Sequence, residues 1–298
     1  MFIDGRTEFY GNEFLKTYRE ATKGNEDKIQ EIIAKYDLQG FLLAISEANF
    51  DQELAKYLLA SHDWKVVYFD ENSILFLKDT TDNRNIVQRF NINLKDWVAP
   101  KADLEKIGPR IIYPRSYIFR GETLKEIGCF DSALSEAREA LKIMPNSVEA
   151  FKLFGDCYLK LKDYQNASKN YRLALKISPK SAELLNSYAL ALYKLGNLSQ
   201  AEVQLLKAIK QRPKDAVNYH ALAMLYRKQN RLEKAKEMAK KSCEYSGNRN
   251  YDYIKLYADT LCDLKDYGEA LKIYKLAARL DPKNYQLKET IEKIEKTL

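Results

Sequence analysis

Histidine and cysteine are scarce in this chain of 298 residues. Its two histidines, His62 and His220, are too few for a dense histidine metal site, and they exclude most histidine-based catalysis. The four cysteines lie far apart and form no Cys-x-x-Cys pair, so neither zinc binding nor redox chemistry is indicated. We expect four reduced cysteines in or near the core, no metal ion and no cofactor.

The sequence motifs of common enzyme classes are also absent. The chain has no Gly-x-Gly-x-x-Gly or Gly-x-x-x-x-Gly-Lys loop for phosphates, and no Gly-x-Ser-x-Gly turn for a nucleophilic serine. An acid/base pair is suggested by Asp4, Glu8, Asp70 and Glu71, but turn or surface roles are far commoner for such residues. We therefore predict no catalytic residue and no enzymatic activity.

Long apolar runs are missing as well. No stretch approaches the roughly 20 apolar residues that cross a membrane. The first residues lack the basic and apolar regions of a signal peptide. With 46% hydrophobic and 31% charged residues the composition is globular, and the length suggests about two domains.

The charge divides the chain near residue 113. Residues 1–113 hold 15 Lys and Arg against 19 Asp and Glu, a net charge of −4. Residues 114–298 hold 34 against 23, a net charge of +11, and 13 basic and 6 acidic residues lie in 182–249. This asymmetry indicates two domains and an acidic partner for the second, although lysines also solvate helix surfaces.

Residues 114–284 repeat with a period of 34, with one extra residue near Asn250. Small residues at the eighth position let two helices approach closely: Gly121, Gly155, Ala189, Ala223 and Ala258. Alanines mark the crossing on the second helix: Ala133, Ala167, Ala201, Ala235 and Ala270. Prolines close four of the repeats, since proline cannot continue a helix: Pro145, Pro179, Pro213 and Pro282. The fourth repeat has Gly247 instead.

This pattern resembles the tetratricopeptide repeat (TPR). The resemblance implies a mostly α fold: a right-handed TPR α-solenoid of five helix pairs. The repeats are 114–147, 148–181, 182–215, 216–249 and 251–284. Residues 285–298 are expected to form an amphipathic capping helix that covers the last repeat with Leu287, Ile291 and Ile294.

In this family the concave face is lined by side chains of each first helix. Carried onto this chain, the resemblance implies a groove that is basic and aromatic in its middle and acidic at its C-terminal end. The candidate peptide-binding residues are Lys152, Asn186, Leu190, Tyr193, Lys194, His220, Met224, Arg227 and Lys228. We expect a protein or peptide partner with acidic and apolar character, because the groove offers both basic and apolar side chains.

Residues 1–93 break the period and predict a small α/β domain with a mixed sheet. Strands are expected at the N-terminus and at 41–45, 64–70 and 73–78, the last two joined by a hairpin at Glu71 and Asn72. Helices are expected in the segments between them and in 82–90. Residues 94–113 are predicted to be a connector with a short helix.

Residues 1–90 carry a second resemblance, in "MFIDGRTEFYGNEFLKTY" and "WKVVYFDENSILFLK". They are similar to the soluble, non-cytoplasmic segment of large bacterial multi-span membrane proteins that are glycosyltransferase-like. This resemblance implies that the chain is part of a larger membrane protein and begins in the middle of a strand. The transferase site would then lie upstream of Met1.

The sequence thus favours a non-catalytic interaction scaffold that binds a peptide in its TPR groove. The alternative is the tail of a membrane-embedded glycosyltransferase-like protein, which positions an acceptor or assembles a complex. We do not expect nucleic-acid binding, because the lysines are dispersed among acids and no reading motif occurs. A complete chain would be cytoplasmic, and a fragment would be membrane-attached and non-cytoplasmic. The sequence does not set the oligomeric state.

Overall fold

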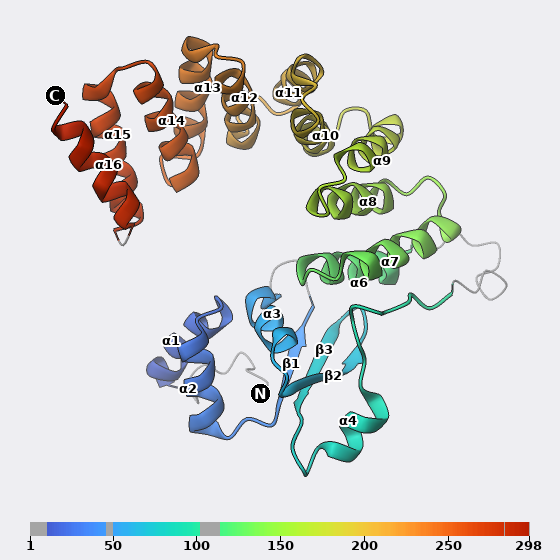
Figure 1. Cartoon of the computed structure of the whole chain (residues 1–298). Coiled ribbons are helices and arrows are strands. Elements are labelled where there is room, and N and C mark those ends of the chain that lie inside the picture. The colour runs from blue at the N-terminus through green and yellow to red at the C-terminus, as the bar shows by residue number, and fades with distance from the viewer. Residues whose placement is uncertain (1–10, 46–49, 102–113, 283, 298) are drawn as a thin grey trace. The chain divides into compact units, whose positions relative to one another are not determined.

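The computed structural model describes residues 11–45, 50–101, 114–282 and 284–297 (Figure 1). The chain divides into two compact units, Met1–Leu161 and Lys162–Leu298. The predicted N-terminal strand, the turn at Asp4-Gly5-Arg6 and the acids Asp4 and Glu8 lie outside the described residues.

In its described residues the first unit contains a small sheet, four helices before residue 91 and three helices after residue 114. The strands are β1 (Gly40–Ala44), β2 (Trp64–Phe69) and β3 (Ser73–Lys78). The helices are α1 (Gly11–Thr22), α2 (Glu26–Tyr36), α3 (Gln52–Ala60), α4 (Arg84–Phe90), α6 (Arg115–Glu126), α7 (Phe130–Ile143) and α8 (Val148–Lys160). The elements predicted between residues 12 and 90 are therefore present. Residues 94–101 contain no helix, and the rest of the predicted connector lies outside the described residues.

The described sheet is antiparallel, with the strand order β1-β3-β2. Leu42 lies opposite Leu75 in one pair, and Val66 lies opposite Phe76 in the other. For the three described strands the prediction of a mixed sheet was therefore wrong, and the predicted N-terminal strand lies outside the described residues. The crossover through α3 does bring β2 back in the direction of β1, but β3 inserts between them. Each strand thus has only antiparallel neighbours among the described residues.

Asp70 organises the turn between β2 and β3. Its Oδ1 accepts hydrogen bonds from the backbone N–H groups of Asn72 and Ser73, both at 2.8 Å, and its Oδ2 accepts one from the Tyr68 hydroxyl. Burial acts to raise the pKa of Asp70, but these hydrogen bonds outweigh it and lower the pKa. Asp70 therefore has the turn role expected for it.

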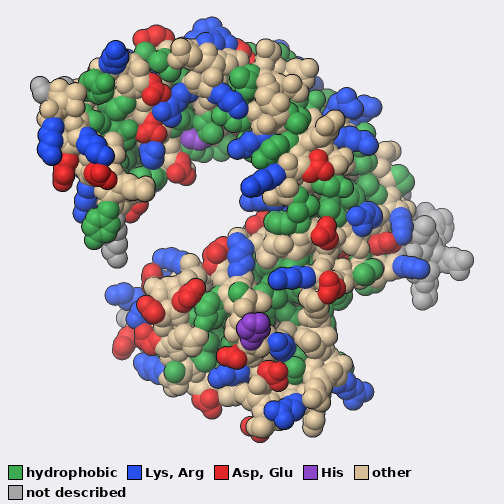
Figure 2. Space-filling model, viewed as in Figure 1, with side chains coloured by type: hydrophobic (Ala, Val, Ile, Leu, Met, Phe, Trp, Pro, Cys, Tyr) green, Lys and Arg blue, Asp and Glu red, His purple; other side chains and the backbone are tan. Residues whose placement is uncertain are grey.

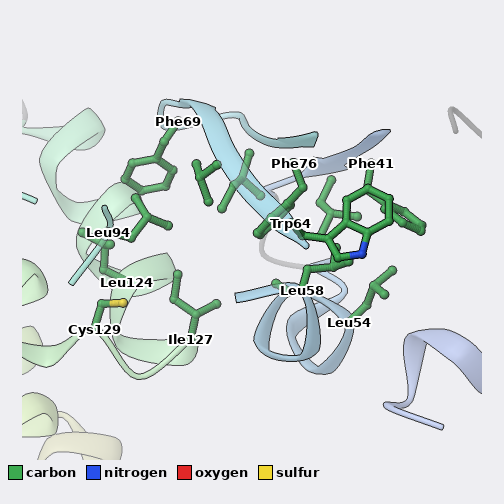
Figure 3. Close-up of a cluster of buried hydrophobic side chains, with 14 of the residues drawn as sticks. Phe41, Leu54, Leu58, Trp64, Phe69, Phe76, Leu94, Leu124, Ile127 and Cys129 are labelled. Carbon is green, nitrogen blue, oxygen red and sulfur yellow. The ribbon is translucent and has the colours of Figure 1, made fainter. Parts of the chain in front are cut away.

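One hydrophobic cluster joins the sheet to the first helices of the repeat region. Its members include Phe69 and Leu94 from the front segment and Leu124, Ile127 and Cys129 from α6 and the turn after it. Figure 3 shows these last three side chains packed on the side of the cluster opposite Leu54 and Leu58 of α3. Burial of these apolar surfaces stabilises the contact between sheet and repeat.

A buried ion pair also connects the sheet region to the first helices of the repeat region. Arg120 on α6 donates two hydrogen bonds to Glu136 on α7, at 2.8 and 2.9 Å, and Glu136 has no exposed surface. The indole Nε1 of Trp97 donates a third, at 2.7 Å. The remaining Nη1 of Arg120 lies 3.6 Å from a carboxylate oxygen of Glu71, in the β2–β3 turn. Three charge-assisted contacts thus satisfy a carboxylate that would otherwise be costly to bury.

The second unit is a stack of helix pairs. Its helices are α9 (Tyr164–Ile177), α10 (Ala182–Lys194), α11 (Leu198–Gln211), α12 (Ala216–Lys228), α13 (Leu232–Tyr245), α14 (Tyr251–Asp263), α15 (Tyr267–Leu280) and α16 (Tyr285–Glu295). On α16, Leu287 and Ile294 are buried and Ile291 packs against the same cluster as α14 and α15. The prediction of a covering C-terminal helix is therefore confirmed.

The sequence period reappears as a structural period. The small residues at the eighth position and the alanines of the second helices are all buried. The first helices of repeats two to five each begin after a residue whose side chain accepts a backbone N–H: Ser147, Ser181, Asp215 and Asn250. The residue that joins the two helices of each repeat has a positive φ: Gly128, Lys162, Gly196, Asn230 and Lys265.

Gly121 shows why a small residue is required at the eighth position. A Cβ atom added there would lie 2.4 Å from Cδ2 of Leu153 on α8, which is far closer than a carbon–carbon contact permits. The predicted close approach of helices is therefore confirmed at this position.

Candidate functional site

An apolar pocket of about 190 Å³ lies between α10 and α12, the first helices of two consecutive repeats. The helix starts are fixed by their caps, with Ser181 accepting from Leu184 N and Asp215 from Val217 N. The lining residues are Asn186, Ala189, Leu190, Tyr193, Leu205, Val217, His220, Ala221, Met224 and Leu225. The two caps set the register of the helices, so side chains one turn apart on each helix face the same space.

Five residues predicted to line a groove meet in this pocket: Asn186, Leu190, Tyr193, His220 and Met224. Leu190 is 37% exposed, which is high for a leucine of a packed helix. The pocket is therefore open to solvent and offers apolar surface to an incoming side chain. Its role in binding stays a prediction.

Two polar atoms of α12 are buried without a hydrogen-bond partner among the described residues. They are Nδ2 of Asn218 and Nδ1 of His220. Asn218 is 1% exposed, and its Oδ1 accepts a hydrogen bond of 2.9 Å from Nδ2 of Asn186 in the pocket wall. Unpaired buried polar atoms are unfavourable, because folding removes them from water without replacing the lost hydrogen bonds.

The environment of His220 favours its neutral form. Burial lowers the pKa of the imidazole, and the nearby Asp252 carboxylate opposes this effect without cancelling it. The ring lies 4.6 Å from the ring of Tyr253, measured between centroids. A neutral imidazole has one nitrogen that accepts a hydrogen bond and one that donates.

Arg227 is held by acidic residues of the following repeat. Its Nε donates a hydrogen bond to Asp263, and its Nη1 lies 3.7 Å from Oδ2 of Asp259. Asp259 also accepts from Lys255 at 2.8 Å and from the Tyr274 hydroxyl at 2.6 Å. The hydrogen bond to Asp263 raises the pKa of Arg227 despite its partial burial. The basic middle and the acidic end predicted for the groove therefore neutralise each other here.

The other predicted basic residues differ in their surroundings. The Lys228 ammonium lies 4.4 Å from the centroid of the Tyr193 ring, a cation–π contact at the pocket rim. Lys194 is exposed. Lys152 belongs to the first unit, where its ammonium lies 3.8 Å from Oδ2 of Asp156.

Asn218 and the pairing of Arg227 were not predicted from the sequence. Val217 and Ala221 also line the pocket and were not among the predicted residues. They precede Met224 at helical spacing, and this spacing could have identified them from the sequence. Asn218 lies next to residues of the buried face, and nothing in its sequence neighbourhood marks its contact with Asn186.

Basic and acidic side chains are mixed over the visible surface of the helical repeats (Figure 2). Within the described ranges, no helix combines the length and the hydrophobicity that a membrane crossing requires. No group of three or more His, Cys, Asp and Glu residues in the same ranges is arranged to hold a metal ion.

Comparison with known proteins identifies the repeat type. One tetratricopeptide repeat model matches residues 159–225, and another matches 216–249 and 256–284. A search of curated proteins gave no match. Both models match only residues after 158, so the glycosyltransferase-like resemblance of residues 1–90 stays a prediction.

Three solved structures illustrate the likeness. PilF of Pseudomonas aeruginosa is 25% identical over 57% of this chain and 78% of its own, with a TM-score of 0.53. TTC0263, a TPR protein of Thermus thermophilus, is 22% identical over 60% of this chain and 96% of its own, with a TM-score of 0.50. YrrB, a TPR protein described as having an unusual peptide-binding site, is 19% identical over 65% and 100%, with a TM-score of 0.51.

These structures share the stacked helix pairs described above. Proteins built from such repeats are typically non-catalytic scaffolds, and the fold is consistent with that role. Residues 159–249 and 256–284 of this chain are therefore tetratricopeptide repeats.

Proposed function

We propose that this chain is a protein-interaction scaffold that binds an extended peptide along α10 and α12. The observation that carries the proposal is the apolar pocket whose wall contains His220, with a buried nitrogen that lacks a partner among the described residues. An apolar side chain of the peptide enters the pocket beside Leu190 and Met224. Burying such an anchor removes apolar surface from water on both partners.

The polar atoms of the wall match the chemistry of a peptide backbone. A peptide group has one N–H donor and one C=O acceptor. The peptide N–H donates to Nδ1 of a neutral His220 that carries its proton on Nε2, after the ring turns this buried nitrogen toward the peptide. Its carbonyl accepts from Nδ2 of Asn186, the amide of the Asn186–Asn218 pair that lines the pocket.

The charges at the rim favour a peptide with acidic residues near its apolar anchor. Lys194 and Lys228 lie at the C-terminal ends of α10 and α12, beside the pocket residue Tyr193. Arg227 contributes less than the sequence suggests, since Asp263 and Asp259 already hold its guanidinium. The partner is therefore expected to be acidic and apolar, and we expect no catalytic step at this site.

Filling the pocket tests this function. Short random peptides displayed on phage are selected on the full chain, and the dissociation constant of an enriched peptide is measured by fluorescence anisotropy. Ala221→Phe places a ring in the pocket, so affinity should fall about tenfold or more. Val203→Phe on α11 is the control, because Val203 is 49% exposed and does not line the pocket.

Enriched peptides that share an apolar residue flanked by acids would support the proposal. Failure to enrich any peptide, or equal affinities of the Ala221→Phe variant and the unmodified chain, would overturn it.

A further inference from the structure

A second pocket, of about 620 Å³, lies in the first unit. It is formed by the end of α3, the start of β2, the segment 91–95 and the turn between α6 and α7. The lining residues are Lys56, Leu59, Ala60, Ser61, His62, Trp64, Lys65, Val66, Asn91, Ile92, Asn93, Leu94, Lys95, Ile127, Gly128 and Cys129. We call it the basic pocket. It does not contribute to the peptide site proposed above.

The charge of the basic pocket is of one sign. Lys56, Lys65 and Lys95 line it, and no Asp or Glu is among the lining residues. Lys56 is paired with Glu53 at 2.8 Å. Lys65 and Lys95 have no carboxylate within 4 Å among the described residues. This positive pocket stands out because residues 1–113 carry a net charge of −4.

The N-terminus of helix α7 adds to the positive potential. Helix α7 begins at Phe130, immediately after Gly128 and Cys129 in the pocket wall, and its 14 residues direct the positive end of the helix dipole toward that wall. The Lys95 ammonium is close enough to Cys129 to act against the effect of burial, which raises the pKa of the thiol.

The floor of the basic pocket is apolar. Leu59 and Ile92 line it with partly exposed side chains, and behind them lie Trp64, Leu94, Ile127 and Cys129, buried members of the cluster drawn in Figure 3. A site with basic side chains at its rim and an aromatic and aliphatic floor matches a molecule that has an anionic group at one end and an apolar body at the other.

We propose that the basic pocket binds a small organic anion, a carboxylate or a phosphate ester with an apolar group. The anionic end pairs with Lys65 and Lys95, and the apolar part lies against Leu59 and Ile92, which are partly exposed. Such a ligand contacts the sheet and the first repeat at once, because α3 and β2 form one wall and the α6–α7 turn forms another. Binding therefore stabilises the contact between these two layers.

Calorimetric titration of the full chain with phenyl phosphate tests the proposal. We expect saturable binding with a dissociation constant below about 1 mM. Inorganic phosphate, which has the charge but no apolar body, should bind at least about tenfold more weakly, and benzyl alcohol should give no saturable signal. Hexanoate in place of phenyl phosphate shows whether the pocket prefers the carboxylate or the phosphate form, and tight binding of either one supports the proposal.

Two matched double variants locate the binding. Lys65→Gln/Lys95→Gln removes the two unpaired lysines of the pocket and should weaken phenyl phosphate binding about tenfold. Lys176→Gln/Lys210→Gln removes the same charge from exposed positions on α9 and α11 and should leave the affinity unchanged. Ala60→Glu, at an exposed lining position, places a negative charge in the pocket and should abolish binding.

Absence of saturable binding by both phenyl phosphate and hexanoate would overturn the proposal. Equal losses in the two double variants would also overturn it, because they would indicate a general charge effect. If inorganic phosphate bound as tightly as phenyl phosphate, the apolar floor would not contribute to the affinity, and this would contradict its role in the site.

Discussion

Arg120 on α6 and Glu136 on α7 form two parallel hydrogen bonds, of 2.8 and 2.9 Å, inside the first unit. Glu136 has no exposed surface and Arg120 is 8% exposed. The pair also receives the indole of Trp97 and lies close to Glu71 of the β2–β3 turn. The Arg120–Glu136 pair thus adds a polar connection between the sheet turn, the segment after it and the first repeat, beside the hydrophobic cluster described above.

Removing one partner of this pair should destabilise the first unit strongly. Arg120→Leu leaves the Glu136 carboxylate buried without its main partner, so the free energy of unfolding should fall by about 3–5 kcal/mol. Urea unfolding followed by tryptophan fluorescence measures this, since Trp97 reports directly on the pair. The double variant Arg120→Leu/Glu136→Leu should lose less than the two single variants combined. A loss below about 1 kcal/mol in Arg120→Leu would contradict the account.

The turn glycines provide a second test. Gly196 has a φ of +82°, and an added Cβ would contact nothing within 4 Å, so only the backbone conformation matters there. Gly196→Ala should lower the free energy of unfolding by about 1 kcal/mol, as measured by thermal unfolding. Gly268→Ala is the matched control: it lies in α15, is equally uncrowded, and should be neutral or stabilising. A stabilising effect of Gly196→Ala would be inconsistent with the left-handed turn.

The buried imidazole of His220 makes stability depend on pH. Burial lowers its pKa in the folded protein. Below the ordinary value of about 6.5 the unfolded chain therefore binds a proton that the folded chain does not, and stability falls as the pH falls. The slope attributable to one such group is at most about 1.4 kcal/mol per pH unit.

Chemical denaturation between pH 7 and pH 5 should show this slope in the unmodified chain and a smaller one in His220→Gln. His62→Gln changes an exposed side chain and leaves His220 in place, so the dependence of stability on pH that is due to His220 should remain. Identical slopes for the unmodified chain and His220→Gln would refute the assignment.

The rim lysines should set the salt dependence of peptide binding. Lys194→Gln/Lys228→Gln removes two positive charges beside the pocket, so an enriched acidic peptide should bind about three- to tenfold more weakly and with a flatter dependence on salt concentration. Arg227→Gln is the comparison, and its effect should be smaller because Arg227 is already paired with Asp263. Anisotropy titrations at several salt concentrations distinguish the two. A larger effect from Arg227→Gln would mean that the peptide displaces the acidic residues.

The repeat architecture could be predicted from the sequence because its determinants are local and recur. Ala201 and Ala235 occupy equivalent positions 34 residues apart, and each is completely buried in the structure. Periodicity does not specify which strands are neighbours, so the order β1-β3-β2 had to come from the structure. The pairing of Arg227 with Asp263 was missed because the two residues lie in different repeats, 36 residues apart.

The two pockets also differ in how far they could be predicted from the sequence. The pocket between α10 and α12 was largely predicted, because five of its residues fall at the positions that the repeat pattern singles out. The basic pocket was not predicted. Lys65, Lys95 and Cys129 come from three separate segments, and only the packing of the sheet against the first repeat brings them together.

That packing has a consequence for assembly. A stack of identical helix pairs has two open faces onto which further pairs, or another copy of the stack, can add. In the first unit the sheet cluster, with Phe69 and Leu94, occupies the outer surface of α6 and α7. In the second, Leu287 and Ile294 of α16 occupy the surface of the last pair. Each of these two surfaces is already covered by another element of its own unit, so we expect that another copy of the stack cannot pack directly on either of them.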